Sequence, residues 1–271
     1  MRIYCMICGW RKNEGAALNQ TEKSNICPTP EMSVIIPAYN EEKWIALTIQ
    51  NLSIFLQQEF SDWEILIVDD GSTDSTRSIC EEYQERIKNL TYLCNEKNSG
   101  KGYSVRRGML TARGKYRFFM DADLPFELEV LRTMNDELSQ KSDIAIGARD
   151  LPGSTLIGVP FIRFLAGQIF SLLVGLFAVK GISDTQCGLK GFRAAAAEAI
   201  FSRTTINDFG MDVEVLFIAQ RLGYTITRIP VRMTGFRGDS RVHLFKDSLN
   251  MFFELLLIRW KALTGKYRLR G

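Results

Sequence analysis

The sequence has little of what several large classes of protein require. It contains one histidine, His243, among 271 residues, and no recognisable partner that would make it part of a Ser-His-Asp triad. This excludes a serine hydrolase of that type. The formal net charge is only +3, which gives no reason to expect nucleic acid as a partner. Internal repeats and low-complexity tracts are also missing.

The six cysteines form no visible disulfide framework. Three of them lie within or beside hydrophobic segments: Cys80, Cys94 and Cys187. This placement favours reduced thiols in a cytosolic compartment. Cys5 and Cys8 form a CxxC pair and Cys27 follows, but no histidine or fourth ligand is nearby, so we expect no zinc site there.

Long uninterrupted apolar runs are scarce as well. Residues 159–179 are mostly apolar, but Arg163 and Gln168 interrupt them, whereas a spanning helix needs roughly 20 apolar residues. An interfacial or buried helix is therefore expected. The segment Leu249–Trp260 fits either a helix in the lipid headgroup layer or one packed on the protein's own core. Residues 1–30 lack the apolar core of a signal peptide, and we expect a poorly ordered extension.

What the sequence does contain is a regular alternation of buried strands and helices. The expected strands are 32–37, 64–68, 90–94, 116–120 and 143–148. The pattern predicts one α/β domain over residues 31–271, with a mainly parallel sheet, helices on both faces and ligands beyond the carboxyl ends of the strands. The part beyond Arg149 is less regular, and we expect residues 150–271 to bind the acceptor and to face a membrane. Past Tyr224 basic residues outnumber acids, which suits an anionic surface.

Asp121 and Asp123 directly follow the fourth expected strand, with one small residue between them. Leaving the end of a sheet, both can face one hard cation that grips a diphosphate. This is the chemistry of nucleotide-sugar transfer. An Asp-x-Asp pair alone is a weak signal, because most such pairs are solvated loop acids, but further motifs accompany it in order.

Two of these motifs follow the first two strands. Residues 37–41 come after the first strand and residues 69–76 after the second. A carboxylate here, Asp69 or Asp70, can accept the uracil imide proton, and Tyr39 can border the base. Either motif alone reads as an ordinary turn, but together at adjacent strand ends they favour a nucleotide site.

A third motif is the glycine turn at residues 98–102. It lacks the spacing of a Walker loop and the third glycine of a dinucleotide fingerprint, which excludes both. A tight turn that brings the backbone and Lys101 near a diphosphate remains. Arg106, on the next helix, either helps to bind the diphosphate or is an ordinary surface arginine.

Together with residues 184–192, these motifs resemble the inverting glycosyltransferases of family 2, and within them the polyprenyl-phosphate branch that includes the dolichyl-phosphate β-glucosyltransferases. The resemblance runs from about residue 32 to residue 260. It implies a GT-A fold, a UDP-sugar donor, Mg²⁺ or Mn²⁺, and a polyprenyl phosphate acceptor at the cytoplasmic face of a membrane.

The resemblance also implies roles for individual residues. Those expected to bind the donor are Pro37, Ala38, Tyr39, Glu41, Asp69, Asp70, Lys101, Asp121, Asp184 and Gln186. Asp121 would contact the nucleotide, and Asp123 would bind the metal with Asp121 as a second ligand. Both aspartates are expected to be catalytic residues. Arg149 and Arg163 would bind the acceptor phosphate, since two guanidiniums can hold a phosphate bidentately. Arg163 can equally snorkel from an interfacial helix.

Asp212 lies where the members that use a sugar hydroxyl carry a catalytic base. A phosphate oxygen is already anionic and needs no strong base. We therefore expect Asp212 to orient or assist modestly, or to cap a helix.

Two functions are in competition. The first is transfer of a hexose, with glucose favoured by the resemblance, from a UDP-sugar to dolichyl or undecaprenyl phosphate. The second keeps the fold but uses a sugar hydroxyl of a surface polysaccharide. A catalytically silent membrane scaffold is a third hypothesis, against which the intact acids and glycines argue. Family members that transfer mannose often carry His-Pro after the acidic motif. This chain has Pro125-Phe126 instead, which weakens the hypothesis that it transfers mannose.

Overall fold

The computed structural model describes residues 29–155, 171, 173–175, 178–208, 210–233 and 244–267. Arg163, His243 and the CxxC pair lie outside the described residues. So do residues 1–28 and most of the apolar segment 159–179, so the expectations for them stay predictions.

The centre of the molecule is one seven-stranded sheet with the order β3-β2-β1-β4-β6-β5-β7. The strands are β1 (Met32–Ala38), β2 (Trp63–Asp69), β3 (Leu90–Cys94), β4 (Tyr116–Phe119), β5 (Ile144–Ala148), β6 (Lys190–Arg193) and β7 (Ile226–Pro230). Only β6 runs antiparallel to its neighbours, β4 and β5. The predicted mainly parallel sheet is therefore confirmed.

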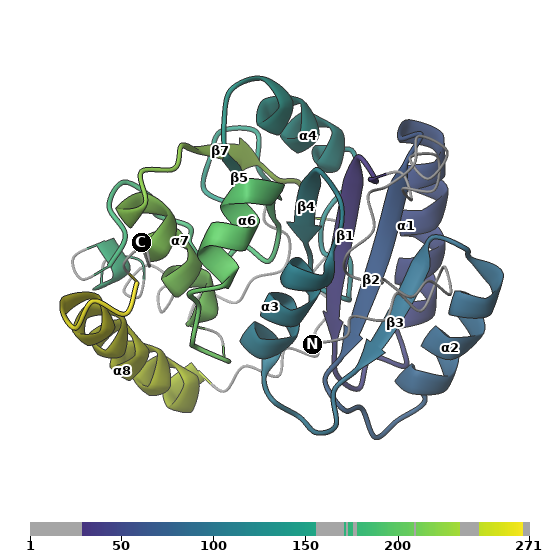
Figure 1. Cartoon of the computed structure of the whole chain (residues 1–271), viewed down its shortest axis with the longest axis horizontal. Coiled ribbons are helices and arrows are strands. Elements are labelled where there is room, and N and C mark those ends of the chain that lie inside the picture. Colours follow the sequence, from purple (N-terminus) through teal and green to yellow (C-terminus); the bar gives the residue numbers. More distant parts are fainter. Residues whose placement is uncertain are drawn as a thin grey trace, which may run out of the picture.

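Helices cover both faces of this sheet (Figure 1). They are α1 (Ile45–Glu59), α2 (Thr76–Arg86), α3 (Lys101–Thr111), α4 (Val130–Gln140), α6 (Ala194–Phe201), α7 (Met211–Arg221) and α8 (Leu244–Leu263). Because side chains alternate along a strand, Val34 and Ile36 pack with α1, α2 and α4 on one face, while Ile35 packs with α3, α6, α7 and α8 on the other.

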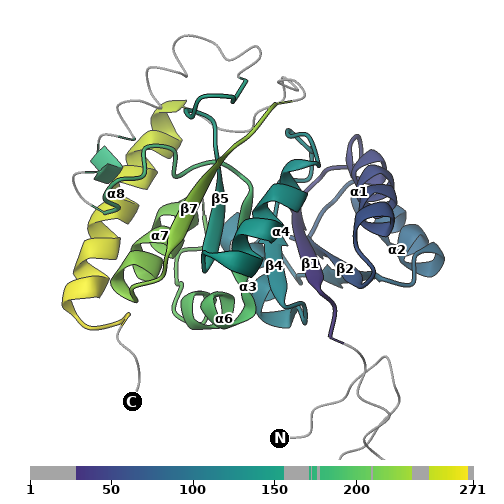
Figure 2. The same ribbon diagram turned by 90° about the horizontal axis from the view of Figure 1, so that it is seen from above.

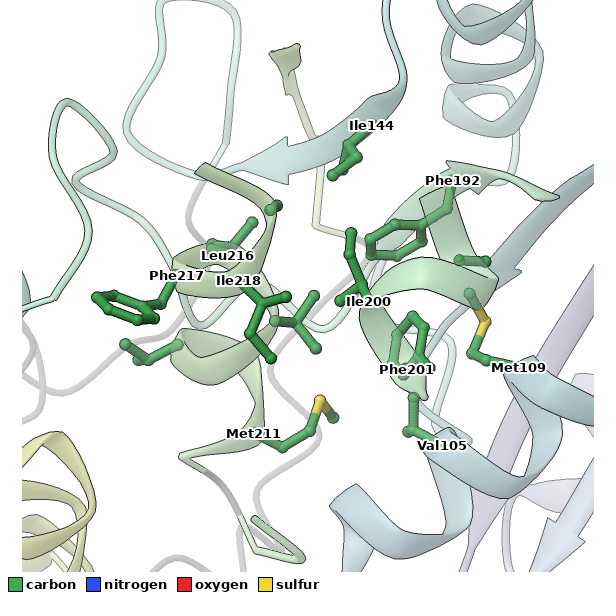
Figure 3. Close-up of a cluster of buried hydrophobic side chains, with 14 of the residues drawn as sticks. Val105, Met109, Ile144, Phe192, Ile200, Phe201, Met211, Leu216, Phe217 and Ile218 are labelled. Atoms are coloured by element: carbon green, nitrogen blue, oxygen red, sulfur yellow. The ribbon is translucent and has the colours of Figure 1, made fainter. Parts of the chain in front are cut away.

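Aromatic and aliphatic side chains fill the second of these layers (Figure 3). Phe192 of β6 packs edge-on against Phe201 of α6, with ring centroids 5.3 Å apart, and stacks near Phe119 of β4. Met109 and Val105 of α3, which belong to the part of the chain before residue 149, lie in the same layer. This shared core joins the two halves of the chain.

Four of the five predicted strands differ from the structure by one residue at one end or at both. Strand β1 does not stop at Pro37 but continues to Ala38, with Pro37 opposite Val68 of β2. The region beyond Arg149 supplies β6 and β7 to the sheet as well as the helices α6, α7 and α8. It departs from the regular alternation of the first part, because residues 178–189 form no helix or strand and β6 is antiparallel to its neighbours.

Helix α8 lies on the outer side of α7, at the opposite end of the molecule from α2 (Figure 2). Its buried residues Leu255, Ile258 and Ala262 join the core, which confirms a helix over the segment ending at Trp260. Among the described residues, no helix has the length and apolar character needed to cross a bilayer.

Candidate active site

The topology fixes where a ligand can bind. From β1 the chain proceeds outward to β2 and β3, and then returns to place β4 on the other side of β1. In open parallel sheets, ligands bind at such a switch point, outside the carboxyl ends of the strands. Tyr39 follows β1 and Asp121 follows β4 at this edge. The two acids of residues 121–123 therefore lie where a nucleotide is expected.

The turns after β1 and β2 are locked together by Asn40. Asn40 has a φ of 53°, a left-handed conformation that asparagine tolerates better than most residues. Its N–H donates to the Ser72 hydroxyl at 2.8 Å, and its side-chain oxygen accepts from the Thr73 N–H at 2.7 Å. Asp69 in turn accepts from the Ser72 N–H at 2.9 Å and from the Tyr92 hydroxyl at 2.6 Å. This bridging role of Asn40 was not predicted from the sequence.

The buried carboxylate of Asp70 holds the glycine turn. It accepts the N–H groups of Ser99 at 3.0 Å and Gly100 at 2.7 Å. The amide of Asn95 and the hydroxyl of Ser104 complete the set, at 2.7 and 3.1 Å. Both oxygens of Asp70 thus bind the turn, so a role in uracil binding for Asp69 or Asp70 remains a prediction beside these structural roles.

Asp121 is fixed from two sides. Lys101 of the glycine turn donates to its carboxylate at 2.6 Å. On the other side lies Gly188, where an added Cβ would stand closer than 3.0 Å to both oxygens of Asp121. Burial disfavours the charge on Lys101, but the carboxylates of Asp121, Asp212 and Asp123 outweigh it and raise the pKa of the amine, which stays charged at neutral pH.

Replacing Gly188 with alanine is expected to reduce about a hundredfold the sugar transfer that the family resemblance implies, because the new methyl must displace the Asp121 carboxylate and an error of about 1 Å at a reacting centre has this cost. Steady-state kinetics with the expected UDP-sugar donor varied measure it. Gly175→Ala is the control, since its Cβ would meet nothing within 4 Å among the described residues. Equal activities for the two variants would contradict the close packing on Asp121.

The chain reverses directly after Asp123, where Leu124 adopts a φ of 45°. This conformation is costly for leucine and is found mostly where the surrounding structure enforces it, often at functional sites. The neighbouring Ala122 carbonyl accepts the buried Thr48 hydroxyl of α1, which anchors the bend. The half-buried side chains of Asp121 and Asp123 are therefore presented by a constrained turn.

A divalent cation fits this donor set in one way. No group of three or more His, Cys, Asp or Glu side chains among the described residues is arranged to hold a metal by itself. Mg²⁺ in phosphate-binding sites uses one or two carboxylates and completes its shell with substrate oxygens and water. Asp123 and Asp121 match that pattern, so the residues fit a cation that arrives with a diphosphate.

Arg149 and Asp184, predicted to serve different ligands, contact each other. The Arg149 Nε and Nη2 atoms donate to the two oxygens of Asp184 at 2.9 and 2.8 Å, and the Arg149 N–H also donates at 2.9 Å. Burial opposes the ionisation of Asp184, but Arg149 prevails and lowers its pKa. Within the described residues the Arg149 Nη1 has no bonded partner, so this atom can still meet an anion.

Gln186 and Cys187 follow on the same loop. The Gln186 Nε2 atom is buried and has no hydrogen-bond partner among the described residues. A buried donor left unpaired is costly. The contact of this amide with the donor sugar remains a prediction. Cys187 is fully buried, which raises the pKa of its thiol to about 12, and its thiol is free.

Lys190, the partner of Asp212, was not predicted from the sequence as part of the site. Lys190 and Asp212 form an ion pair in which the side chains are 0% and 2% exposed. The Lys190 ammonium also donates to the Cys187 carbonyl at 2.8 Å and lies 5.4 Å from the centre of the Phe119 ring. Asp212 caps no helix, because α7 has no side-chain cap. A charged residue between apolar neighbours at Leu189–Phe192 was the available signal.

The loop of residues 204–208, from the C-terminal part of the chain, supports the glycine turn. The Asn207 carbonyl accepts the Gly102 N–H at 2.6 Å, and a Cβ at Gly100, whose φ is 97°, would stand closer than 3.0 Å to it. Arg106 donates to the Thr204 carbonyl and to the Asn207 side chain at 3.4 and 3.0 Å. Arg106 therefore braces this loop.

Helix α8 contacts the N-terminal end of α7 through Glu254, which accepts the N–H of the N-cap residue Gly210 at 3.0 Å. Burial, aided by the nearby Asp208 and Glu214 carboxylates, raises the pKa of Glu254 to about 7, although the Gly210 N–H and Lys261 act in the opposite direction. Deprotonation of this residue therefore destabilises the folded protein.

Replacing Glu254 with glutamine keeps the acceptor for Gly210 and removes the charge. The folded pKa exceeds the ordinary value of 4.5, so the stabilising contribution of Glu254 is complete below pH 4.5 and is lost as the pH rises through 7. The variant should be more stable at pH 8 by on the order of 1 kcal/mol, after allowance for solvent screening, and the gain should vanish towards pH 5. Urea unfolding at both pH values measures this. The exposed Glu85→Gln control should show no such trend.

The fold and these contacts define an α/β protein in which acids, Lys101 and Arg149 gather at the switch point of the sheet. Comparisons with known proteins identify its family. Residues 33–201 match Glycosyl transferase family 2, and the chain belongs to this family. It is 34% identical to the dolichyl-phosphate beta-glucosyltransferase of Dictyostelium discoideum, over 92% of this chain and 80% of the relative. With the Saccharomyces cerevisiae enzyme of that name it shares 36% identity, over 88% and 76%.

A solved structure of similar fold is glucosyl-3-phosphoglycerate synthase from Mycobacterium tuberculosis in complex with Mn²⁺, UDP and phosphoglyceric acid. Its TM-score to this chain is 0.61, with 16% identity, over 93% of this chain and 82% of that one. The likeness at this identity concerns the fold alone, which is the expected GT-A type.

Most of the predicted site residues thus gather at one edge of the sheet. The carboxylates of Asp121 and Asp212 raise the pKa of Lys101. The carboxylates of Asp184 and Asp121 raise the pKa of Arg149. Pro37 and Ala38 end β1 beside Asp69 of β2. The Glu41 N–H donates to the Thr76 hydroxyl at 2.7 Å, which ties this turn to α2. The roles of these residues toward ligands remain predictions.

Proposed function

We propose that this protein transfers glucose from UDP-glucose to a polyprenyl phosphate, with inversion at the anomeric carbon. The observation that carries the proposal is the arrangement at the switch point, where Lys101 and Gly188 fix Asp121 within the electrostatic reach of Arg149. The relatives named as dolichyl-phosphate beta-glucosyltransferases support glucose as the sugar and dolichyl phosphate as the acceptor.

On the donor side, Asp121 and Asp123 would hold Mg²⁺ or Mn²⁺ together with the diphosphate. When bound, the cation supplies charge neutralisation of the UDP leaving group. Lys101 would add a fixed positive charge beside the diphosphate, and the unpaired amide of Gln186 would donate to a sugar hydroxyl. The constrained turns at Asn40 and Leu124 keep these groups in place before the donor arrives.

On the acceptor side, Asp184 orients Arg149 so that its Nη1 atom, which has no partner among the described residues, would meet the acceptor phosphate. A guanidinium there would also screen the repulsion between this phosphate and the donor diphosphate. The acceptor oxygen is anionic and attacks without deprotonation, which agrees with the burial of Asp212 against Lys190. Arg163 is proposed as a second phosphate ligand.

The acceptor is a lipid, so we propose that the protein works at the cytoplasmic face of a membrane, on whose surface α8 rests. The exposed side chains of α8 support this. Phe253, Trp260 and Leu263 are 59%, 61% and 85% exposed, and such apolar faces mark interaction sites.

The test is a transfer assay with the purified full-length chain, UDP-glucose, dolichyl phosphate in detergent and either Mn²⁺ or Mg²⁺. A glucolipid should appear on thin-layer chromatography, disappear with EDTA and return with the added metal. Asp123→Ala should abolish it, whereas Asp136→Ala, an exposed acid on α4, should not. Absence of product with every common UDP-sugar would overturn the proposal.

A further inference from the structure

The ends of α7 and α8 enclose a hollow that the proposed reaction does not use. Its volume is about 390 Å³, and it is lined by Arg221, Arg259, Ala262 and Leu263. Arg221 is the last residue of α7, whereas Asp212 is in its first turn. At about 1.5 Å of rise per residue, roughly 14 Å of helix separates the hollow from Asp212. It is thus distinct from the donor and acceptor sites.

The two arginines of the hollow have no counterion among the residues that the structure describes. Both are exposed, and neither forms an ion pair or hydrogen bond with any residue of the part that the structure describes. The negative end of the α7 dipole accounts for Arg221 but not for Arg259, which extends from another helix. Two neighbouring guanidiniums without carboxylates match the planar, bidentate recognition of phosphate.

The hollow also borders the apolar face of α8. At about 100° per residue, Phe253, Leu257 and Trp260 lie along one strip of the helix, and Leu256 and Leu263 lie beside it. Around the circumference of the helix, Arg259 is the neighbour of Leu263 and lies between this apolar strip and the buried side. A helix that sinks its apolar strip into the acyl boundary would therefore hold Arg259 at the depth of the headgroups.

We propose that the hollow formed by Arg221, Arg259, Ala262 and Leu263 binds the phosphate of an anionic phospholipid headgroup. This rests on the membrane association proposed above and adds a lipid preference to it. The guanidiniums take the phosphate, while Ala262 and Leu263 contact the glycerol and the upper acyl chain. A neutral bilayer would still hold the apolar strip but would leave the two charges unmatched.

The test measures cosedimentation of the full-length chain with phosphatidylcholine vesicles and with vesicles containing 30% phosphatidylglycerol. The double variant Arg221→Gln/Arg259→Gln should lose about 25-fold in affinity for the anionic vesicles, since each basic residue at such a surface contributes about fivefold. Its binding to neutral vesicles should not change. The control Lys88→Gln/Lys141→Gln removes the same charge from exposed sites on other elements and should keep the preference.

Three results would overturn the site: a preference retained by the arginine variant, an equal loss in the lysine control, or displacement of the wild type from anionic vesicles by millimolar inorganic phosphate at constant ionic strength. Transfer to dolichyl phosphate in detergent should be unchanged in the arginine variant. If the wild-type chain shows no transfer to dolichyl phosphate, the proposed reaction is refuted instead. If the wild-type chain binds no vesicle, the membrane association is refuted.

Discussion

Replacing Asp121 with asparagine is expected to lower kcat/KM for glucose transfer by about a thousandfold, with the fold retained. The amide has nearly the same shape as the carboxylate and still fits against Gly188. What it lacks is the charge that pairs with Lys101 at 2.6 Å and that would face the cation. The loss would therefore report electrostatics rather than packing.

A double-mutant cycle with Lys101→Met separates the parts of this effect. Because Lys101 and Asp121 touch, the two losses should not add, and the double variant should be little worse than Asp121→Asn alone. Titration with Mn²⁺ should show a weaker metal requirement in both variants that lack Asp121. The exposed Asp136→Asn serves as the matched control. Activity within tenfold of the wild type in Asp121→Asn would remove the acidic motif from the mechanism.

Replacing Asp212 with asparagine is expected to lower the free energy of unfolding by about 3–5 kcal/mol. The change leaves the Lys190 ammonium buried without its counterion, in a site where both side chains are almost inaccessible to water. Lys190→Met should cost a similar amount, because the Asp212 carboxylate is then the unmatched charge. Urea unfolding followed by circular dichroism measures both.

The variant Lys190→Met/Asp212→Leu distinguishes a structural role for Asp212 from a catalytic one. Replacing a buried ion pair by apolar side chains of similar volume is often neutral or stabilising, so this protein should regain most of its stability. If Asp212 only positions α7 and the loop beside it, the folded double variant should also keep transfer to a lipid phosphate. A stable but inactive double variant would falsify that role and favour a base that serves a sugar hydroxyl.

The alternation of strands and helices up to residue 148 was predictable from local patterns. The strand Leu90–Cys94 has the expected bounds, and the glycine turn and Asp121 meet as their order in the chain implied. These features depend on neighbours in sequence or on the fixed direction of parallel strands. Asp70 was expected at the nucleotide, but its carboxylate organises the turn at Ser99 and Gly100.

The contacts that were not predictable join residues far apart in the chain. The Lys190–Asp212 pair, the support of Gly102 by Asn207 and the bond of Glu254 to Gly210 each require the tertiary arrangement. Periodicity specifies which side of a segment is buried but not what it meets. The antiparallel β6 belongs to the same class, because its four residues carry too short a pattern to specify a partner.

The insertion of β6 limits how this enzyme can be dissected. Although residues up to 149 carry the acids and glycines of the donor site, β5 pairs only with β6 and β7 in the described sheet, and β4 borders β6. A fragment ending there would leave β5 detached and β4 as an open edge prone to aggregation. Chimeras that aim to exchange acceptors should therefore graft loops and α8 onto an intact sheet rather than swap halves of the polypeptide.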